Sequence, residues 1–148
     1  MAKAKSTRRK EKASKNKSTK INENANSYMA KTPVWRFNRV DFEHPKWNLE
    51  NCDVSVEQLY RKLKDFEGQT WQQIDKHSNG KNHFIEFSRM CKEAQERAIK
   101  LHLDQFDSLY SLRLSGTLRL FGLLDDGEYS IIWYDCDHEI CPSTKRHT

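Results

Sequence analysis

Residues 110–121 read Tyr-Ser-Leu-Arg-Leu-Ser-Gly-Thr-Leu-Arg-Leu-Phe, and residues 128–135 read Glu-Tyr-Ser-Ile-Ile-Trp-Tyr-Asp. In the first run leucines alternate with polar residues, which is the two-residue period of a half-buried strand. The second run is β-branched and aromatic, and the Asp-Gly pair before it is typical of a hairpin reversal. The two runs therefore predict a β-hairpin that carries Arg113 and Arg119 on one face of its first strand.

Two capping signatures precede this hairpin and indicate where helices begin. Ser55 is followed three residues later by Gln58, and Thr70 is followed by Gln73, which is the spacing of a capping box. An apolar helical stripe follows the first signature and stops at Gly68, so we expect a helix there and a short second helix over residues 71–76. A further stripe predicts a third helix with buried positions at Met90, Cys91, Ala94, Ala98 and Leu101.

The order of elements predicts the fold class. Residues 33–42 alternate as a short strand with Trp35 and Phe37 toward the core, and another short strand is possible at 139–141. A strand, then helices, then consecutive strands indicate a single α+β domain over residues 33–148. We expect a small antiparallel sheet with two to three helices on one face. Its other face would then be an open surface with Arg113, Arg119 and Tyr134.

The excess positive charge lies in the first twenty residues. Nine of the 26 Lys and Arg residues and one of the 21 Asp and Glu residues fall there, so this arm carries +8 and the rest sums to about −3. Residues 1–20 also lack a large apolar side chain to bury, and residues 21–32 are polar and rich in Asn. Residues 1–32 are therefore expected to be a disordered basic arm and a linker. Such an arm binds polyanions by counterion release, which makes Arg8, Arg9 and Lys10 candidate nucleic-acid contacts. A solubilising terminus is the alternative.

Neither a membrane nor a cofactor is expected as a partner. The sequence has no apolar run of about 18 residues, no apolar segment after its basic start and no lipidation signal, which predicts a cytoplasmic protein. Its cysteines lack paired CxxC spacing and are expected to be ordinary thiols. A zinc site would need Cys136, His138 and Cys141 with Cys52 or His44, but structural zinc sites usually have two tight ligand pairs.

The layout of residues 33–143, with the hairpin and the block from Trp133 to His138, resembles the RelE/ParE/HigB superfamily of toxins from bacterial toxin–antitoxin pairs. Residues 111–143 also look like the end of uncharacterised proteins of bacteria and mobile elements. The resemblance implies a RelE-like fold and a metal-independent ribonuclease that cuts messenger RNA in the ribosome, with an antitoxin protein as partner. In the ParE branch it implies a poison of DNA gyrase.

The resemblance also implies roles for residues near the C-terminus. Arg113 and Arg119 would hold RNA phosphates, and Tyr134 and His138 would transfer protons. Metal-free RNA cleavage requires a base, an acid and positive charge beside the phosphorus, for which histidine and arginine are suited. On one continuous strand the two arginines would stand roughly 20 Å apart, so each is expected to contact a different phosphate.

Other interpretations of the same residues remain open at this point. The arginines would pair with Glu128, Asp135 or Glu139 on a solvated sheet face, or His138 would cap the strand end through a neighbouring aspartate. His77 and His83 flank a polar loop; the expectation is a plain surface loop, and the alternative is that the two histidines reach a neighbouring groove. At the level of function, the alternatives are a non-catalytic module that binds RNA, DNA or protein, and a mobile-element protein that blocks a host factor through its acidic body.

Overall fold

The computed structural model describes residues 28–142, so the arm residues Arg8, Arg9 and Lys10 lie outside the described range. Within it the chain forms three α-helices and five strands, which confirms the expected α+β class. In chain order they are β1 (Val34–Arg36), α2 (Val56–Glu67), α3 (Trp71–His77), β2 (His83–Glu86), α4 (Lys92–Lys100), β3 (Ser108–Ser115), β4 (Leu118–Asp125) and β5 (Glu128–Asp135). Short 3-10 turns cover Tyr28–Ala30, Leu49–Asn51 and Phe87–Arg89.

The five strands form one mixed sheet in the order β1-β5-β4-β3-β2. The pairs β2–β3, β3–β4 and β4–β5 are antiparallel, whereas β1 runs parallel to β5 with Trp35 opposite Tyr129. The expectation of a purely antiparallel sheet was therefore wrong at this edge. A parallel pair needs a long crossover, and here the whole chain between β1 and β5 supplies it.

The run at residues 110–121 is not one strand but parts of two. The chain reverses between Ser115 and Leu118 through Gly116, whose φ of +52° is the left-handed conformation that glycine tolerates best. The period of two continues across the turn because both strands of a hairpin point their leucines to the same side. Leu112 and Leu120 are direct partners across β3 and β4. The sequence pattern therefore concealed the reversal.

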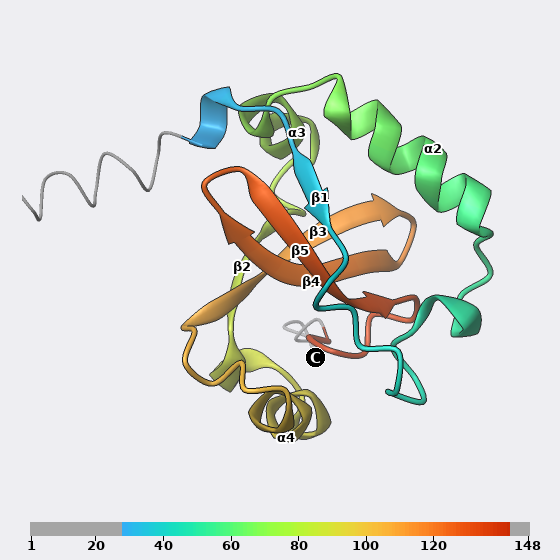
Figure 1. Cartoon of the computed structure of the whole chain (residues 1–148), viewed down its shortest axis with the longest axis vertical. Coiled ribbons are helices and arrows are strands. Elements are labelled where there is room, and N and C mark those ends of the chain that lie inside the picture. The colour runs from blue at the N-terminus through green and yellow to red at the C-terminus, as the bar shows by residue number, and fades with distance from the viewer. Residues whose placement is uncertain (1–27, 143–148) are drawn as a thin grey trace, which may run out of the picture.

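Helices cover both faces of the sheet rather than one. Figure 1 shows α2 and α3 on one side of the sheet and α4 on the other. The first core lies under α2 and α3 and includes Leu59, Leu63, Trp71, Ile74, Tyr110, Leu112, Leu120, Tyr129, Ile131 and Tyr134. The second lies under α4 and includes Trp47, Ile85, Met90, Ala94, Ala98, Leu109, Phe121, Ile132, Trp133 and Ile140. The face that was expected to be open is therefore partly covered by α4 and its core.

The composition of β5 explains this second core. Its central residues are apolar at both parities, and Tyr129, Ile131, Ile132, Trp133 and Tyr134 are all buried. Continuous apolar character is typical of a strand that is covered on both faces. An irregularity of pairing between Phe121 and Gly122 also lets Ile132 and Trp133 enter the same core.

Both predicted capping boxes are confirmed. The Ser55 hydroxyl accepts a hydrogen bond from the Gln58 amide at 3.1 Å, and the Ser55 amide donates to the Gln58 side chain at 2.8 Å. Thr70 and Gln73 make the same reciprocal pair at the start of α3. Gly68 ends α2 as expected. Because local hydrogen bonding fixes where these helices begin, their first residues could be predicted from the sequence.

Other local expectations were wrong. β2 was not predicted, because only Ile85 of its four residues is buried and the alternation is too short to recognise. Residues 139–141 form no strand. Trp35 packs against the first core and donates to the Leu63 carbonyl at 3.2 Å, but Phe37 is 48% exposed because β1 ends at Arg36.

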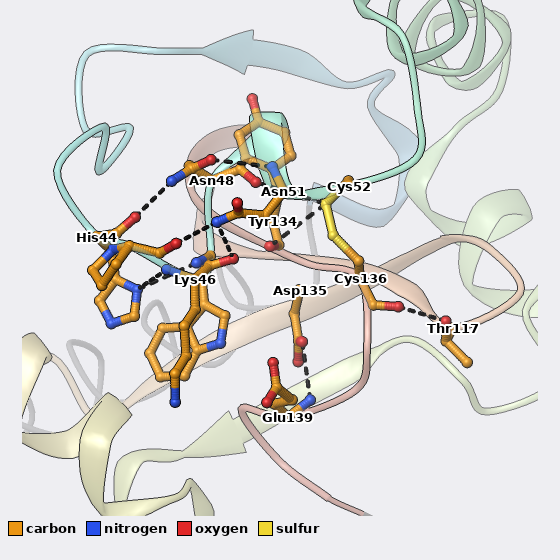
Figure 2. The surroundings of a disulfide bond; sticks show 12 residues. His44, Lys46, Asn48, Asn51, Cys52, Thr117, Tyr134, Asp135, Cys136 and Glu139 are labelled. Atoms are coloured by element: carbon orange, nitrogen blue, oxygen red, sulfur yellow. Dashed lines mark hydrogen bonds between the residues drawn. A yellow bond between two sulfur atoms is a disulfide. The ribbon is translucent and has the colours of Figure 1, made fainter.

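A disulfide joins Cys52 to Cys136, 84 residues apart in the sequence (Figure 2). Their Cα atoms lie 5.5 Å apart because the turn at Leu49–Asn51 packs beside the end of β5. The expectation of ordinary thiols was wrong for this pair, while Cys91 and Cys141 are free. Disulfides persist mainly in oxidising compartments, so a cytoplasmic location stays a prediction. Among residues 28–142, no helix is long and apolar enough to cross a membrane.

Candidate functional site

Arg113 and Arg119 are neighbours in the folded chain. They are direct partners across the β3–β4 hairpin, and both guanidinium groups donate to the Gly116 carbonyl, from Arg113 Nε at 3.3 Å and Arg119 Nη1 at 3.1 Å. The expected separation of roughly 20 Å was wrong because the turn folds one arginine beside the other. The two side chains are therefore close enough to contact one anionic group.

No carboxylate within residues 28–142 forms an ion pair with either arginine. Glu128, one of the expected partners, instead accepts from Arg36 at 2.6 Å. Burial and the nearby Arg113 charge lower the pKa of Arg119, while Asp135 acts in the opposite direction. Two like charges in a partly dehydrated place favour an added anion, because the anion reduces their repulsion.

Asp135 organises the loop that follows β5. Its side chain is buried, and its two carboxylate oxygens accept from the backbone amides of Glu139 and Ile140, each at 2.9 Å. Figure 2 shows the contact with Glu139 beside the disulfide. The loop bends sharply at His138, whose φ is +59°. The expected hydrogen bond from His138 to an aspartate is not formed within the described chain, since backbone groups occupy Asp135.

A groove of about 710 Å³ opens over the second core, between this loop, the start of β2 and the 3-10 turn at Phe87–Arg89. We call it the basic groove. The ionisable or basic side chains that line it are Lys81, His83, Arg89, Arg119, Asp135, Cys141 and His138, and its apolar lining includes Ile85 and Phe121. The groove is therefore lined by three Lys or Arg residues and by one acidic residue, Asp135.

The structure brings together two of the predicted site residues, Arg119 and His138, in this groove. Arg113 lies beside it at the hairpin turn, where its backbone amide donates to the buried Asn82 side chain at 2.8 Å. Tyr134 does not join them. It belongs to the first core, on the opposite face of the sheet, and burial raises its pKa.

Sequence reasoning missed Lys81, His83 and Arg89 as neighbours of Arg119. The available signal was the alternation of His83, Phe84, Ile85 and Glu86, which is weak because it covers four residues. His83 pairs with Ser111, and Ser111 pairs with Phe121. These pairings bring the polar loop at residues 77–83 to the arginine hairpin, so His83 is more than plain surface.

The ligand preference of the groove follows from its charges. Neither Lys81 nor Arg89 forms an ion pair with any other residue of the described range. Within that range no three His, Cys, Asp or Glu side chains gather as metal ligands. The zinc alternative also loses two of its ligands, because Cys52 and Cys136 are bonded to each other. The guanidinium and ammonium groups that line the groove, beside two imidazoles, are suited to anion binding.

Comparison of the chain with protein-family models, with curated proteins and with solved structures gave no match.

Proposed function

We propose that this chain is a toxin-like, RNA-targeting protein of the toxin–antitoxin type whose basic groove holds the RNA backbone. One observation supports it above all: Lys81, Arg89 and Arg119 line one groove and form no ion pair within residues 28–142. Evenly spaced phosphates are the natural partners of such unpaired cations.

In its enzymatic form the same proposal is a messenger RNA endoribonuclease. Arg119 would stabilise the charge that develops on the phosphate, and His138 would transfer a proton. The resemblance to RelE-type toxins supports this reading, as does the presence of both residues in one groove. An antitoxin protein and the ribosome are the partners that this function would require.

Binding of a fluorescent single-stranded RNA to the full chain tests the groove directly. Arg119→Ala should weaken RNA binding several-fold. The slope of the logarithm of affinity against the logarithm of salt concentration should become less steep by about 0.7 for each phosphate contact that is lost. Arg61→Ala is the matched control, because Arg61 lies on α2 with its side chain 75% exposed. Equal losses in the two variants would contradict the assignment of the groove.

The basic arm needs its own variant, since it binds RNA by charge alone. Replacing Arg8, Arg9 and Lys10 together by glutamine in the full chain should lower the salt dependence further. The effect of Arg119→Ala should be preserved in that background, because the groove and the arm would act independently. Arrest of bacterial growth on expression, relieved by Arg119→Ala, is the corresponding test in cells.

A further inference from the structure

We propose that His83 is the second proton-transfer residue of the basic groove and that, with His138, it cleaves single-stranded RNA by way of the RNA's own 2′-hydroxyl. This inference rests on the function proposed above and deepens it. It replaces Tyr134, which the fold places in the opposite core, by a histidine that lies in the same groove as Arg119.

The strand register places His83 on the arginine side of the sheet. His83 is opposite Ser111, and Ser111 is opposite Phe121, so the three side chains form a row on one face of β2, β3 and β4. The Cα atoms of His83 and Phe121 are two strand spacings apart, about 10 Å. Arg119 is two residues from Phe121 on the same face, so an imidazole and a guanidinium both reach into the groove.

His138 enters the groove from the other side. Asp135 is opposite Arg119 in the β4–β5 pair, and its carboxylate holds the amides of Glu139 and Ile140. These bonds fold the loop back so that His138 lines the groove. The strands lie in the order β5-β4-β3-β2. His138 follows β5, His83 begins β2, and Arg119 belongs to β4, which lies between those two strands.

This arrangement suits an in-line displacement at phosphorus. The attacking and leaving oxygens occupy opposite sides of the phosphorus, so the base and the acid must also lie on opposite sides. His138 follows β5 and His83 begins β2, so the two histidines enter the groove from either side of β4, which carries Arg119. Arg119 and Lys81 supply positive charge for the phosphorus-centred transition state. Asp135 acts as a positioning residue, because its carboxylate bonds the loop rather than the RNA.

The reaction balances without a further reactant. One imidazole, in its neutral form, takes the proton of the 2′-hydroxyl while the 2′-oxygen forms a bond to phosphorus. The bond from phosphorus to the 5′-oxygen breaks, and the other imidazole, in its protonated form, gives its proton to that oxygen. The products are a 2′,3′-cyclic phosphate and a 5′-hydroxyl end. Histidine is suited to both roles because it exchanges protons near neutral pH.

The test uses the full chain, a fluorescent single-stranded RNA and a chelator. His83→Gln and His138→Asn should each slow cleavage by a factor of about 10² to 10⁴ while RNA affinity changes little. Asparagine is chosen at His138 because it tolerates the left-handed backbone there. His77→Gln is the control, since His77 is exposed on α3 and contacts Gln69. A strand of the same base sequence with 2′-deoxyribose at every position has no 2′-hydroxyl group, so it should bind and remain intact.

Each result has a separate meaning. Cyclic phosphate ends that depend on both groove histidines support the inference. Cleavage that survives His83→Gln, cleavage of the 2′-deoxy strand, or bound RNA that stays intact would overturn it, and the RNA-binding function would stand. Failure of the unaltered chain to bind RNA would overturn the proposed function itself.

Discussion

Among single residues, Asp135 positions the loop that carries His138. It carries a buried carboxylate at the end of a central strand and satisfies two loop amides that would otherwise lack acceptors. The same bonds bring His138 into the groove that Arg119 also lines. The residues that supply positive charge, Lys81, Arg89 and Arg119, are therefore different from the residue that positions the His138 loop, and they come from separate segments of the chain.

His44 is a second residue whose environment has a measurable effect. It is 4% exposed and stacks on Trp47, and its Nδ1 accepts from the amides of Lys46 and Trp47. Accepting these bonds requires an unprotonated Nδ1. Burial lowers the pKa of His44, partly offset by Glu93 and Asp41. The folded protein therefore favours the neutral ring.

We expect stability to fall in mild acid because of this histidine. Its folded pKa lies below its unfolded value of about 6.5, so the unfolded chain binds more protons below that pH. The contribution is complete above pH 6.5 and is lost as the pH falls toward the folded pKa. Urea unfolding between pH 8 and pH 5 should show this slope, and His44→Gln should reduce it. If the unfolding free energy depends on pH equally in both proteins, a group other than His44 causes the dependence.

Among the elements, the β4–β5 pair has the strictest packing requirement. Gly122 lies at its irregularity, and a Cβ there would collide with the Ser130 carbonyl and come within 3.1 Å of the Tyr129 ring. Both partners belong to the same sheet, and Tyr129 is fully buried between Trp35, Trp71 and Tyr110. Neither can move without disturbing the first core.

Gly122→Ala should therefore destabilise the protein by about 1–3 kcal/mol, as overpacking of a core does. Gly68→Ala is the matched control, because a Cβ there meets only the Asp65 carbonyl at an ordinary 3.5 Å. Its effect should stay within about 1 kcal/mol. Thermal or urea unfolding measures both variants, and similar losses at the two glycines would contradict the packing argument.

In the whole molecule, one sheet is shared by two cores, and the disulfide connects the segment before α2 to the end of β5. Figure 2 shows Cys136 immediately after Asp135, with its carbonyl bonded to the Thr117 hydroxyl at the hairpin turn. The disulfide therefore supports the end of the sheet at which the loop with His138 begins. Closing 84 residues of chain restricts the unfolded state strongly.

Replacing Cys52 and Cys136 together by serine should cost about 2–5 kcal/mol of unfolding free energy. A thiol reductant should lower the stability of the unaltered protein in the same way and leave the double variant unchanged. Cys91→Ser is the control, because Cys91 is a free thiol. If reductant has no effect on the unaltered protein, the bond does not contribute to its stability.

Much of this architecture was predictable because it depends on neighbours in the sequence. The capping boxes at Ser55 and Thr70 and the strand at residues 128–135 follow from local hydrogen bonding, propensity and apolar period. The α+β class follows from their order. Arg119 and His138 were candidates because of the resemblance and of the chemistry of arginine and histidine, and both line the groove.

Packing between distant segments decided the rest. A pattern of period two does not show which face of a strand is covered. The sequence therefore could not show that Tyr134 and Arg119 lie on opposite faces of the sheet. Only the folded chain shows that α4 covers the second face, that Cys52 reaches Cys136, and that the start of β2 brings His83 to the arginine hairpin. These contacts join residues far apart in the chain, and their geometry depends on how whole elements pack.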